Sequence, residues 1–241
     1  MVDGAAHVIC HRSGRTGWVV MSRPPRNMID EQMAVELLDA LKGQEASPDV
    51  DVIVLAGAGE CFCAGADAAS VRRSGRAEEF AQAVGDLFGF FPGSPKPIVG
   101  AVRGDALAGG FGLLCSCDVV VLGAGAEVGT IEAQFGAWPM IAQVPVTRRV
   151  PEKAALVNIL TGEPFSAERA LALGVVDEVV AVGHVHDRAE HWARKIAVSG
   201  AACAVGRPLF FQSRDQDYMQ ALKGAQGAFA RSFTIPAEQG S

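Results

Sequence analysis

Short runs of apolar, largely β-branched residues alternate along the chain with longer stretches in which apolar residues recur every three or four positions. The first pattern predicts short buried strands, and the second predicts amphipathic helices. Strands are expected at residues 18–21, 52–55, 98–102, 119–122 and 175–182. An alternation of this kind predicts an α/β fold.

The expected helices carry start and stop signals. Asp30 can cap a helix whose apolar face holds Met33 and Leu37, because a carboxylate before the first turn accepts from free backbone N–H groups. Ser166 begins another helix, which Gly174 ends. Further helices are expected at residues 77–90, 107–114, 151–160, 187–198 and 215–231.

Composition narrows the class of protein. The 241 residues are 49% hydrophobic and 20% charged, which is enough for a sizeable core and excludes a disordered chain. The formal net charge is −6, and a basic face of the kind that binds nucleic acid is missing. Arg72, Arg73 and Arg76 form the one basic cluster, which fits either a solvated helix start or a small anionic ligand.

Neither a membrane partner nor a metal is expected. The longest uncharged stretch, residues 133–147, is shorter than the ~18 apolar residues of a span and contains two prolines. The first residues show no signal peptide. All six cysteines have apolar sequence neighbours and are interpreted as small core residues, including the Cys61–Cys63 and Cys115–Cys117 pairs. A cytoplasmic location is expected.

Nucleotide-binding and hydrolase signatures are missing. A dinucleotide-binding fold needs G-x-G-x-x-G after its first strand, where this chain has R-P-P-R-N at residues 23–27. The pair Gly57 and Gly59 lacks the third glycine, and neither a Walker A motif nor G-x-S-x-G occurs. A nucleotide-dependent oxidoreductase is therefore the weakest of the functions considered.

Two loops of small residues follow predicted strands, at residues 55–67 and 102–112, and each leads into a predicted helix. Glycine and alanine leave backbone N–H groups uncovered, and a helix start adds the positive end of its dipole. Two such loops side by side can direct two N–H groups at one oxygen, an oxyanion hole in which each donor contributes roughly 3–4 kcal/mol to a transition state. Composition alone favours tight strand–helix packing over an oxyanion hole.

These loops resemble the crotonase (enoyl-CoA hydratase/isomerase) superfamily. Residues 61–67, C-F-C-A-G-A-D, are similar to the family's x-F-x-A-G-A-D turn, and residues 102–110, V-R-G-D-A-L-A-G-G, to its V-x-G-x-A-x-G-G-G turn. Further similarities are the early Arg23-Pro24 with Asn27, the Cys117-Asp118 pair, and residues 160–177. The resemblance extends over residues 5–232.

The resemblance implies a spiral of ββα repeats over residues 1–185 and a helical C-terminal region over residues 186–241. It implies an acyl-CoA substrate, whose CoA is part of the substrate and not a separate cofactor, and a homotrimer or homohexamer. The amides of Ala66 and Gly109 would hold the thioester oxygen as an enolate. The positions expected to contact the substrate and its CoA are Arg26, Ala64, Asp67 and Gly110.

The carboxylates depart from the hydratase pattern. Hydratases of the family use two glutamates to hold and activate water, and the first position is Gly112 here. Counting 14 residues from Asp118 puts the second at Glu132. A competing register starts at A-Q-F-G, residues 133–136, and puts Met140 there, but the G-A-W-P at residues 136–139 favours Glu132.

One carboxylate beside an oxyanion hole can move a proton along an acyl chain, so isomerase-like proton transfer is favoured over full hydratase activity. Asp67 is interpreted as a helix-start charge and Asp118 as a buried turn partner. Glu132 as a surface residue and Asp105 as an extra acid remain open. A CoA-binding relative with weak or lost catalysis is the alternative function.

Two further expectations concern the ends of the substrate. The family's additional C-terminal segment, which contacts the CoA adenine, is not found before Ser241, so weak adenine contacts are expected. Five apolar side chains fit either an acyl pocket or the core: Phe88, Phe90, Phe91, Trp138 and Met140.

Overall fold

The computed structural model describes residues 6–233. Its main sheet has six strands in the order β1-β2-β3-β4-β6-β9, and every neighbouring pair except β1·β2 is parallel. The strands are β1 (Val8–Ser13), β2 (Thr16–Met21), β3 (Val52–Gly57), β4 (Ile98–Val102), β6 (Val119–Gly123) and β9 (Glu178–Val180). Central strands β3 and β4 are buried along their whole length, which explains their continuous apolar sequences.

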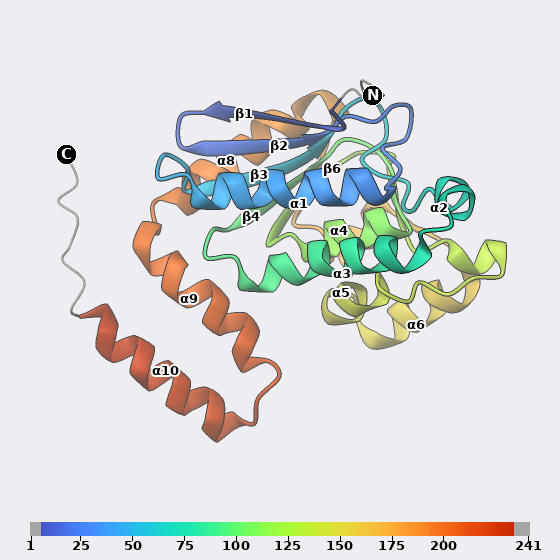
Figure 1. The fold of residues 1–241 in the computed structure, drawn as a ribbon. Helices are drawn as coiled ribbons and strands as arrows, with labels where there is room; N and C mark the ends of the chain where they lie inside the picture. The colour runs from blue at the N-terminus through green and yellow to red at the C-terminus, as the bar shows by residue number, and fades with distance from the viewer. Residues whose placement is uncertain (1–5, 234–241) are drawn as a thin grey trace.

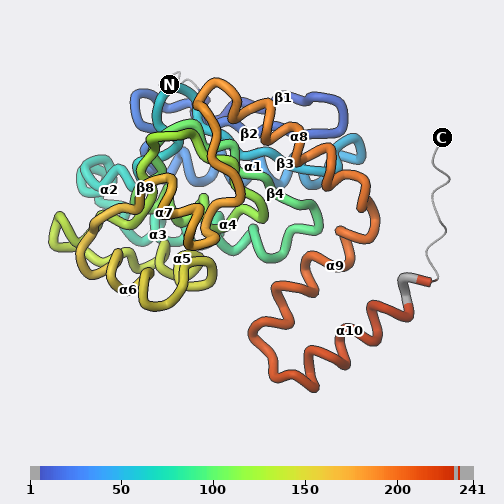
Figure 2. Tube along the Cα trace, turned by 180° about the vertical axis from the view of Figure 1, so that it is seen from behind, coloured from blue at the N-terminus to red at the C-terminus, as the bar shows by residue number. Residues whose placement is uncertain are grey.

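Helices cover both faces of the main sheet (Figures 1 and 2). On one face, α1 (Glu31–Ala46), α3 (Ala77–Gly93) and α4 (Gly109–Ser116) enclose the larger apolar core. On the other, α8 (Val185–Ala197) packs Val185, Ala189 and Ala193 on the sheet in a smaller core. The α/β class expected from the alternating pattern is confirmed.

A small second sheet lies next to the main one. Its three strands are β5 (Ala106–Leu107), β7 (Glu127–Gly129) and β8 (Phe165–Ser166). Strand β5 leads into α4, and β7 leads into a short 3-10 helix (Glu132–Phe135). The remaining helices of the body are α2 (Ala68–Ser74), α5 (Gln143–Arg149), α6 (Glu152–Thr161), α7 (Ala167–Ala172) and a second 3-10 helix (Val182–His184).

Several predicted boundaries are wrong for identifiable reasons. The strand expected at residues 175–182 is limited to β9, because Val175 N–H instead donates to Ala170 O at the end of α7. The helix expected from residue 107 begins at Gly109, since Leu107 belongs to β5. The elements that were not expected from the sequence include the strands β1, β5, β7 and β8 and the helices α5 and α9 (Gly200–Ser213).

All six cysteines are free. Cys63, Cys115 and Cys117 are buried core residues, and burial raises the pKa of the Cys63 thiol to about 12. Cys10 is an exception to the predicted core role, because it is exposed on the edge strand β1. No group of three or more His, Cys, Asp or Glu side chains within residues 6–233 is arranged to hold a metal ion. No helix in this range combines the length and apolarity needed to cross a membrane.

Helices α9 and α10 (Tyr218–Ser232) form an arm that projects from the body (Figure 1). Arg207 attaches α9 to the body: its Nε donates to Asp118 Oδ2 at 2.7 Å, and its Nη1 donates to the carbonyl oxygens of Phe91 at 2.7 Å and Ser94 at 2.6 Å. Asp118 also accepts from the Ile98 N–H at 2.7 Å, in keeping with its predicted structural role. The division at residue 185 stays a prediction, and the segment from residue 234 to the end, on which the adenine expectation falls, lies outside the described residues.

We expect Arg207→Met to lower the free energy of unfolding by about 3 kcal/mol, because it removes the close ion-pair partner of the partly buried Asp118 and the side-chain donor to two carbonyl groups. Urea unfolding followed by circular dichroism measures the change. Arg214→Met is the control, since that exposed side chain at the end of α9 makes one bond to the Arg148 carbonyl. Equal losses from both variants would contradict an anchoring role for Arg207.

Candidate active site

The two small-residue loops lie side by side. Strands β3 and β4 are parallel neighbours, so the loops that follow them leave the same edge of the sheet. Backbone hydrogen bonds join the loops: Phe62 N–H donates to Asp105 O at 3.0 Å, and Leu107 N–H donates to Cys63 O at 2.9 Å. The spatial pairing expected of an oxyanion hole is therefore present.

The amides of Ala66 and Gly109 are free to bind an oxygen. Neither N–H donates a backbone hydrogen bond within residues 6–233. The loops approach so closely that a Cβ added to Gly65, where φ is +86°, would lie 2.9 Å from the Gly109 nitrogen. Ala108, before the second amide, also has a positive φ, at 53°. Such backbone conformations are costly and recur at functional sites.

One cavity of about 680 Å³ brings the predicted site residues together. Its wall includes both amide-bearing residues and, of the other predicted positions, the four residues Arg26, Ala64, Asp67 and Glu132. Gly110 lies behind the wall, where a Cβ would sit 2.1 Å from the Cys63 carbonyl oxygen. Glycine at 110 thus allows the helix to pack against the first loop.

Glu132 is the carboxylate at this cavity without an ion pair among the described residues. It begins the 3-10 helix after β7, and its Oε2 accepts from the Ile131 N–H at 2.9 Å. Burial raises the pKa of this carboxyl, which suits a group that exchanges protons. Met140, the alternative register, also lines the cavity but has no titratable group.

The other two carboxylates near the loops, Asp67 and Asp105, accept hydrogen bonds that give them structural roles. Asp67 caps α2 by accepting from the Ser70 N–H at 2.9 Å, and it pairs with Arg23 Nη2 at 2.9 Å. These bonds lower its pKa, as expected of a helix-start charge. Asp105 accepts from the Glu127 N–H at 2.9 Å and does not line the cavity, so the structure does not support it as an extra acid.

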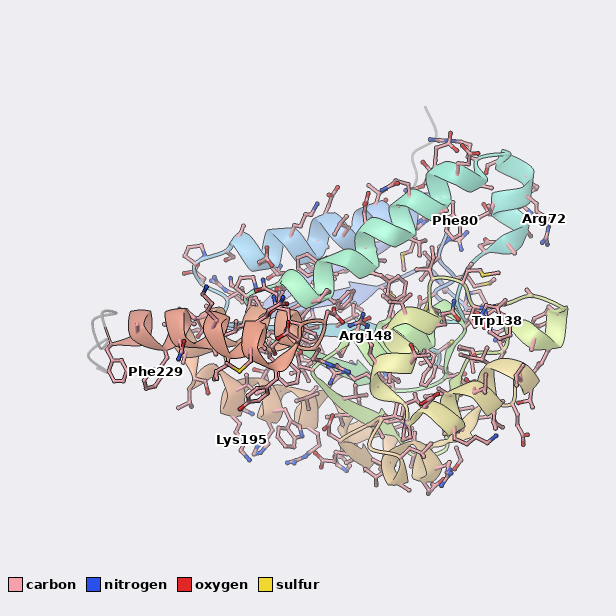
Figure 3. All side chains as sticks on the ribbon, turned by 90° about the horizontal axis from the view of Figure 1, so that it is seen from below. Arg72, Phe80, Trp138, Arg148, Lys195 and Phe229 are labelled. Carbon is pink, nitrogen blue, oxygen red and sulfur yellow. The ribbon has the colours of Figure 1, made fainter. Side chains whose placement is uncertain are left out.

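Two arginines belong to the lining of the cavity. Arg26 and Arg72 are both exposed, both line it, and neither forms an ion pair with a residue in the described range. In Figure 3, Arg72 on α2 lies at the same end of the molecule as Trp138. Of the basic cluster at residues 72–76, only Arg72 reaches the cavity, whereas Arg76 pairs with Glu31 at 2.8 Å.

Part of the cavity is apolar. Phe88, Trp138 and Met140 line it, as the sequence allowed. Phe91 instead faces a second cavity of about 620 Å³ between α3, α5 and α9, and Phe90 lines neither. Gly112 is buried and absent from the wall of either cavity.

Asn158 on α6 binds Thr130, two residues before Glu132, and was not identified from the sequence. Its Nδ2 donates to the carbonyl oxygens of Thr130 at 3.1 Å and Glu163 at 2.7 Å. The Oδ1 of Asn158 accepts from the Thr130 N–H at 3.0 Å and from the Thr130 hydroxyl at 2.7 Å. The one available signal was a polar residue inside an otherwise apolar helical stretch.

Comparisons with known proteins point to one family. The family model for enoyl-CoA hydratase/isomerase matches residues 14–233. A Thermus thermophilus protein, named as an inferred enoyl-CoA hydratase, is 37% identical over 190 residues, covering 76% of this chain and 75% of that protein. The mitochondrial enoyl-CoA hydratase domain-containing protein 3 of Rattus norvegicus is 30% identical over 223 residues, covering 90% and 74%.

A solved structure shares the whole architecture. The crystal structure of an enoyl-CoA hydratase of Mycobacterium smegmatis aligns with a TM-score of 0.90 at 29% identity, over 96% of this chain and 92% of that one. This confirms the crotonase fold with its helical C-terminal region. Because the family model extends over nearly the whole chain and the paired loops lie where the fold requires them, this chain belongs to the enoyl-CoA hydratase/isomerase family of enzymes.

Proposed function

We propose that this enzyme isomerises a 3-enoyl-CoA to a 2-enoyl-CoA. The Glu132 carboxylate removes a proton from C2, which gives a dienolate. The protonated Glu132 then returns this proton to C4: the oxygen pair re-forms the carbonyl group, the C1–C2 π pair becomes the C2–C3 double bond, and the π pair of the former C3–C4 double bond binds the proton. The amides of Ala66 and Gly109 hold the thioester oxygen while it carries the negative charge of the dienolate. The observation that carries this proposal is one cavity in which, among residues 6–233, a carboxylate has no ion pair and two amides donate no backbone hydrogen bond.

Two exposed arginines in the lining of the cavity support binding of CoA. Arg26 and Arg72 offer positive charge for its phosphates. Ala64 lines the same cavity, and Gly110, behind its wall, allows α4 to pack against the loop that carries Ala66. Asp67 contributes through its helix cap and its pair with Arg23, which fix the loop that carries Ala66.

The test incubates the purified protein separately with a 3-enoyl-CoA and a 2-enoyl-CoA while the absorbance of the conjugated thioester is followed. Isomerisation predicts a rise with the 3-enoyl substrate and little loss with the 2-enoyl substrate. Rapid loss with the 2-enoyl substrate would instead identify a hydratase. CoA binding without change in either assay would favour the alternative, a family member that binds CoA with weak or lost catalysis.

We also infer a homotrimer or homohexamer in the cytoplasm. The arm exposes large apolar side chains, including Phe210, Met219 and Phe229, which a second copy would cover. Light scattering of the purified protein measures the molar mass and thus the number of subunits.

The free cysteines fit a cytoplasmic location, although the rat relative is named as mitochondrial.

The pH profile of kcat/KM follows from Glu132. The carboxyl must be ionised to accept the C2 proton, and burial raises its pKa above that of an exposed glutamate. We expect activity to fall as the pH drops through that raised pKa, above the ordinary range near 4.5. Initial rates in overlapping buffers measure the inflection, and a profile that stays flat down to pH ~4 would contradict Glu132 as the base.

Removal of the Asn158 amide should lower kcat. Asn158→Leu keeps the volume but leaves Thr130 and the strand end before Glu132 without their bonds. A small displacement of a catalytic group can cost about 100-fold in rate, so we expect a 10- to 100-fold loss in kcat with little change in KM. Thr161→Val on the same helix is the control, since that hydroxyl bonds only to Val157 O and its neighbour Glu163 N–H. Equal kinetics in both variants would contradict the positioning role.

A further inference from the structure

Position 112 is covered by an aromatic ring. Gly112 lies three residues beyond Gly109 on α4, and a Cβ there would be 2.9 Å from Phe88 Cζ, 3.0 Å from Phe88 Cε1 and 3.2 Å from the Ala142 Cβ. Real Cβ atoms essentially never approach another atom within 3.0 Å, so any side chain at 112 would have to displace the ring. Phe88 and Ala142, and not Gly112, form the cavity wall at this point.

The covering ring is part of the packed core. Phe88 extends from α3, which packs between α1 and α4, and its side chain contacts the larger apolar core. Ile141 and Ala142 continue the same apolar wall. Behind this wall lies the second cavity, which Phe88 and Ile141 also line. The ring therefore separates two spaces, and its removal would open room for a side chain at 112.

The chemical consequence concerns water. An ordered water in a protein cavity needs two to four polar partners, as a rule, and the wall formed by Phe88, Ile141 and Ala142 offers only carbon side chains. Water near this wall is poorly held, whereas the proton taken by Glu132 remains beside the acyl chain. An apolar wall here thus favours return of the proton to the substrate over addition of water.

We propose that Phe88 determines reaction specificity in this enzyme: its ring occupies the space above Gly112 and excludes both a second carboxylate and the water that such a group would hold. This inference rests on the proposed isomerase function. It assigns to a residue on α3, distant in sequence from both loops and from Glu132, the choice between moving a proton and adding water.

The test compares four proteins with the parent: Gly112→Glu, Phe88→Ala, the double variant Phe88→Ala/Gly112→Glu, and the matched double variant Phe88→Ala/Gly112→Gln. Each is assayed for hydration of a 2-enoyl-CoA, in which the water oxygen bonds to C3 and a proton goes to C2, and for isomerisation of a 3-enoyl-CoA. Near-ultraviolet circular dichroism checks the fold. If the first double variant does not fold, Phe88→Leu/Gly112→Asp with Phe88→Leu/Gly112→Asn replaces the pair.

We expect the glutamate double variant to hydrate at least 10-fold faster than its glutamine counterpart and than Gly112→Glu alone, because only it has both the carboxylate and the space. Hydration by Gly112→Glu equal to that of the double variant would overturn the role of Phe88. Equal hydration by the folded glutamate and glutamine double variants would overturn it too. Failure of the proposed function is seen separately, as a parent protein that does not isomerise, whatever the variants do.

Discussion

Glu132→Gln should lower kcat for 3-enoyl-CoA isomerisation by about 1,000- to 10,000-fold, at the upper end of what a positioned acid–base group contributes. The amide of glutamine can still accept from the Ile131 N–H, so the 3-10 helix keeps its geometry while the side chain loses the ability to take a proton. Because the CoA contacts and the oxyanion amides remain, KM should change little. Steady-state kinetics with one 3-enoyl-CoA measure both constants.

Glu127→Gln is the matched control, because that exposed glutamate lies on β7 five residues before Glu132 and does not line the cavity. Its kinetics should equal those of the parent. If Glu132→Gln retained more than a tenth of the parental kcat, the base would have to be another group. The register that puts Met140 in this place offers no titratable alternative.

Glu132→Gln should raise the stability of the protein although it removes activity. Burial raises the folded-state pKa of Glu132, so the unfolded chain ionises at lower pH, and above the folded pKa the charged carboxylate destabilises the native state. Glutamine carries no such penalty. Glu132→Gln should therefore melt at a higher temperature than the parent at pH ~7 and at the same temperature below pH ~4. A substitution that removes activity and raises the melting temperature in this pH-dependent way would show that Glu132 destabilises the native state and serves the reaction.

Local patterns predicted the parts of the site that are contiguous in sequence. The two loops could be recognised because their glycine and alanine residues serve the backbone of the same loop, and α1 could be recognised because Asp30 caps it three residues before Met33. In both cases the residues and the feature that they create are neighbours in sequence. Glu132, in contrast, was located from the family resemblance, by counting 14 residues from Asp118.

Contacts between distant residues left no such pattern. Arg207 and Asp118 are 89 residues apart, and Asn158 and Thr130 are 28 apart, so no periodicity links them. The packing of the Phe88 ring against Gly112 is visible only in three dimensions, where the ring leaves no space for a side chain at position 112. Helix α9 escaped prediction because Gly200, Gly206 and Pro208 disfavour helices, a preference that its packing and its anchor in the core override.

Gly65→Ala should reduce kcat by about 100- to 1,000-fold, which is the effect of losing one oxyanion donor. A methyl group at this position would lie 2.5 Å from the Ala108 Cβ and 2.9 Å from the Gly109 nitrogen, so the two loops would have to separate. Separation moves the amides of Ala66 and Gly109 apart, and they can no longer bind one oxygen together. The fold should survive with a loss of about 1–3 kcal/mol, as for other overpacked sites.

The control separates backbone strain from the close approach of the loops. Gly59 also has a positive φ, +79°, but a Cβ there would meet nothing within 4 Å. Gly59→Ala therefore carries the conformational cost, about 1 kcal/mol, without pushing on the second loop, and should retain parental kcat. Equal kcat values for the two variants would mean that the approach of the loops does not set the position of the amides. A selective loss in Gly65→Ala, with binding of CoA unchanged, would tie catalysis to the close approach of the two loops at Gly65.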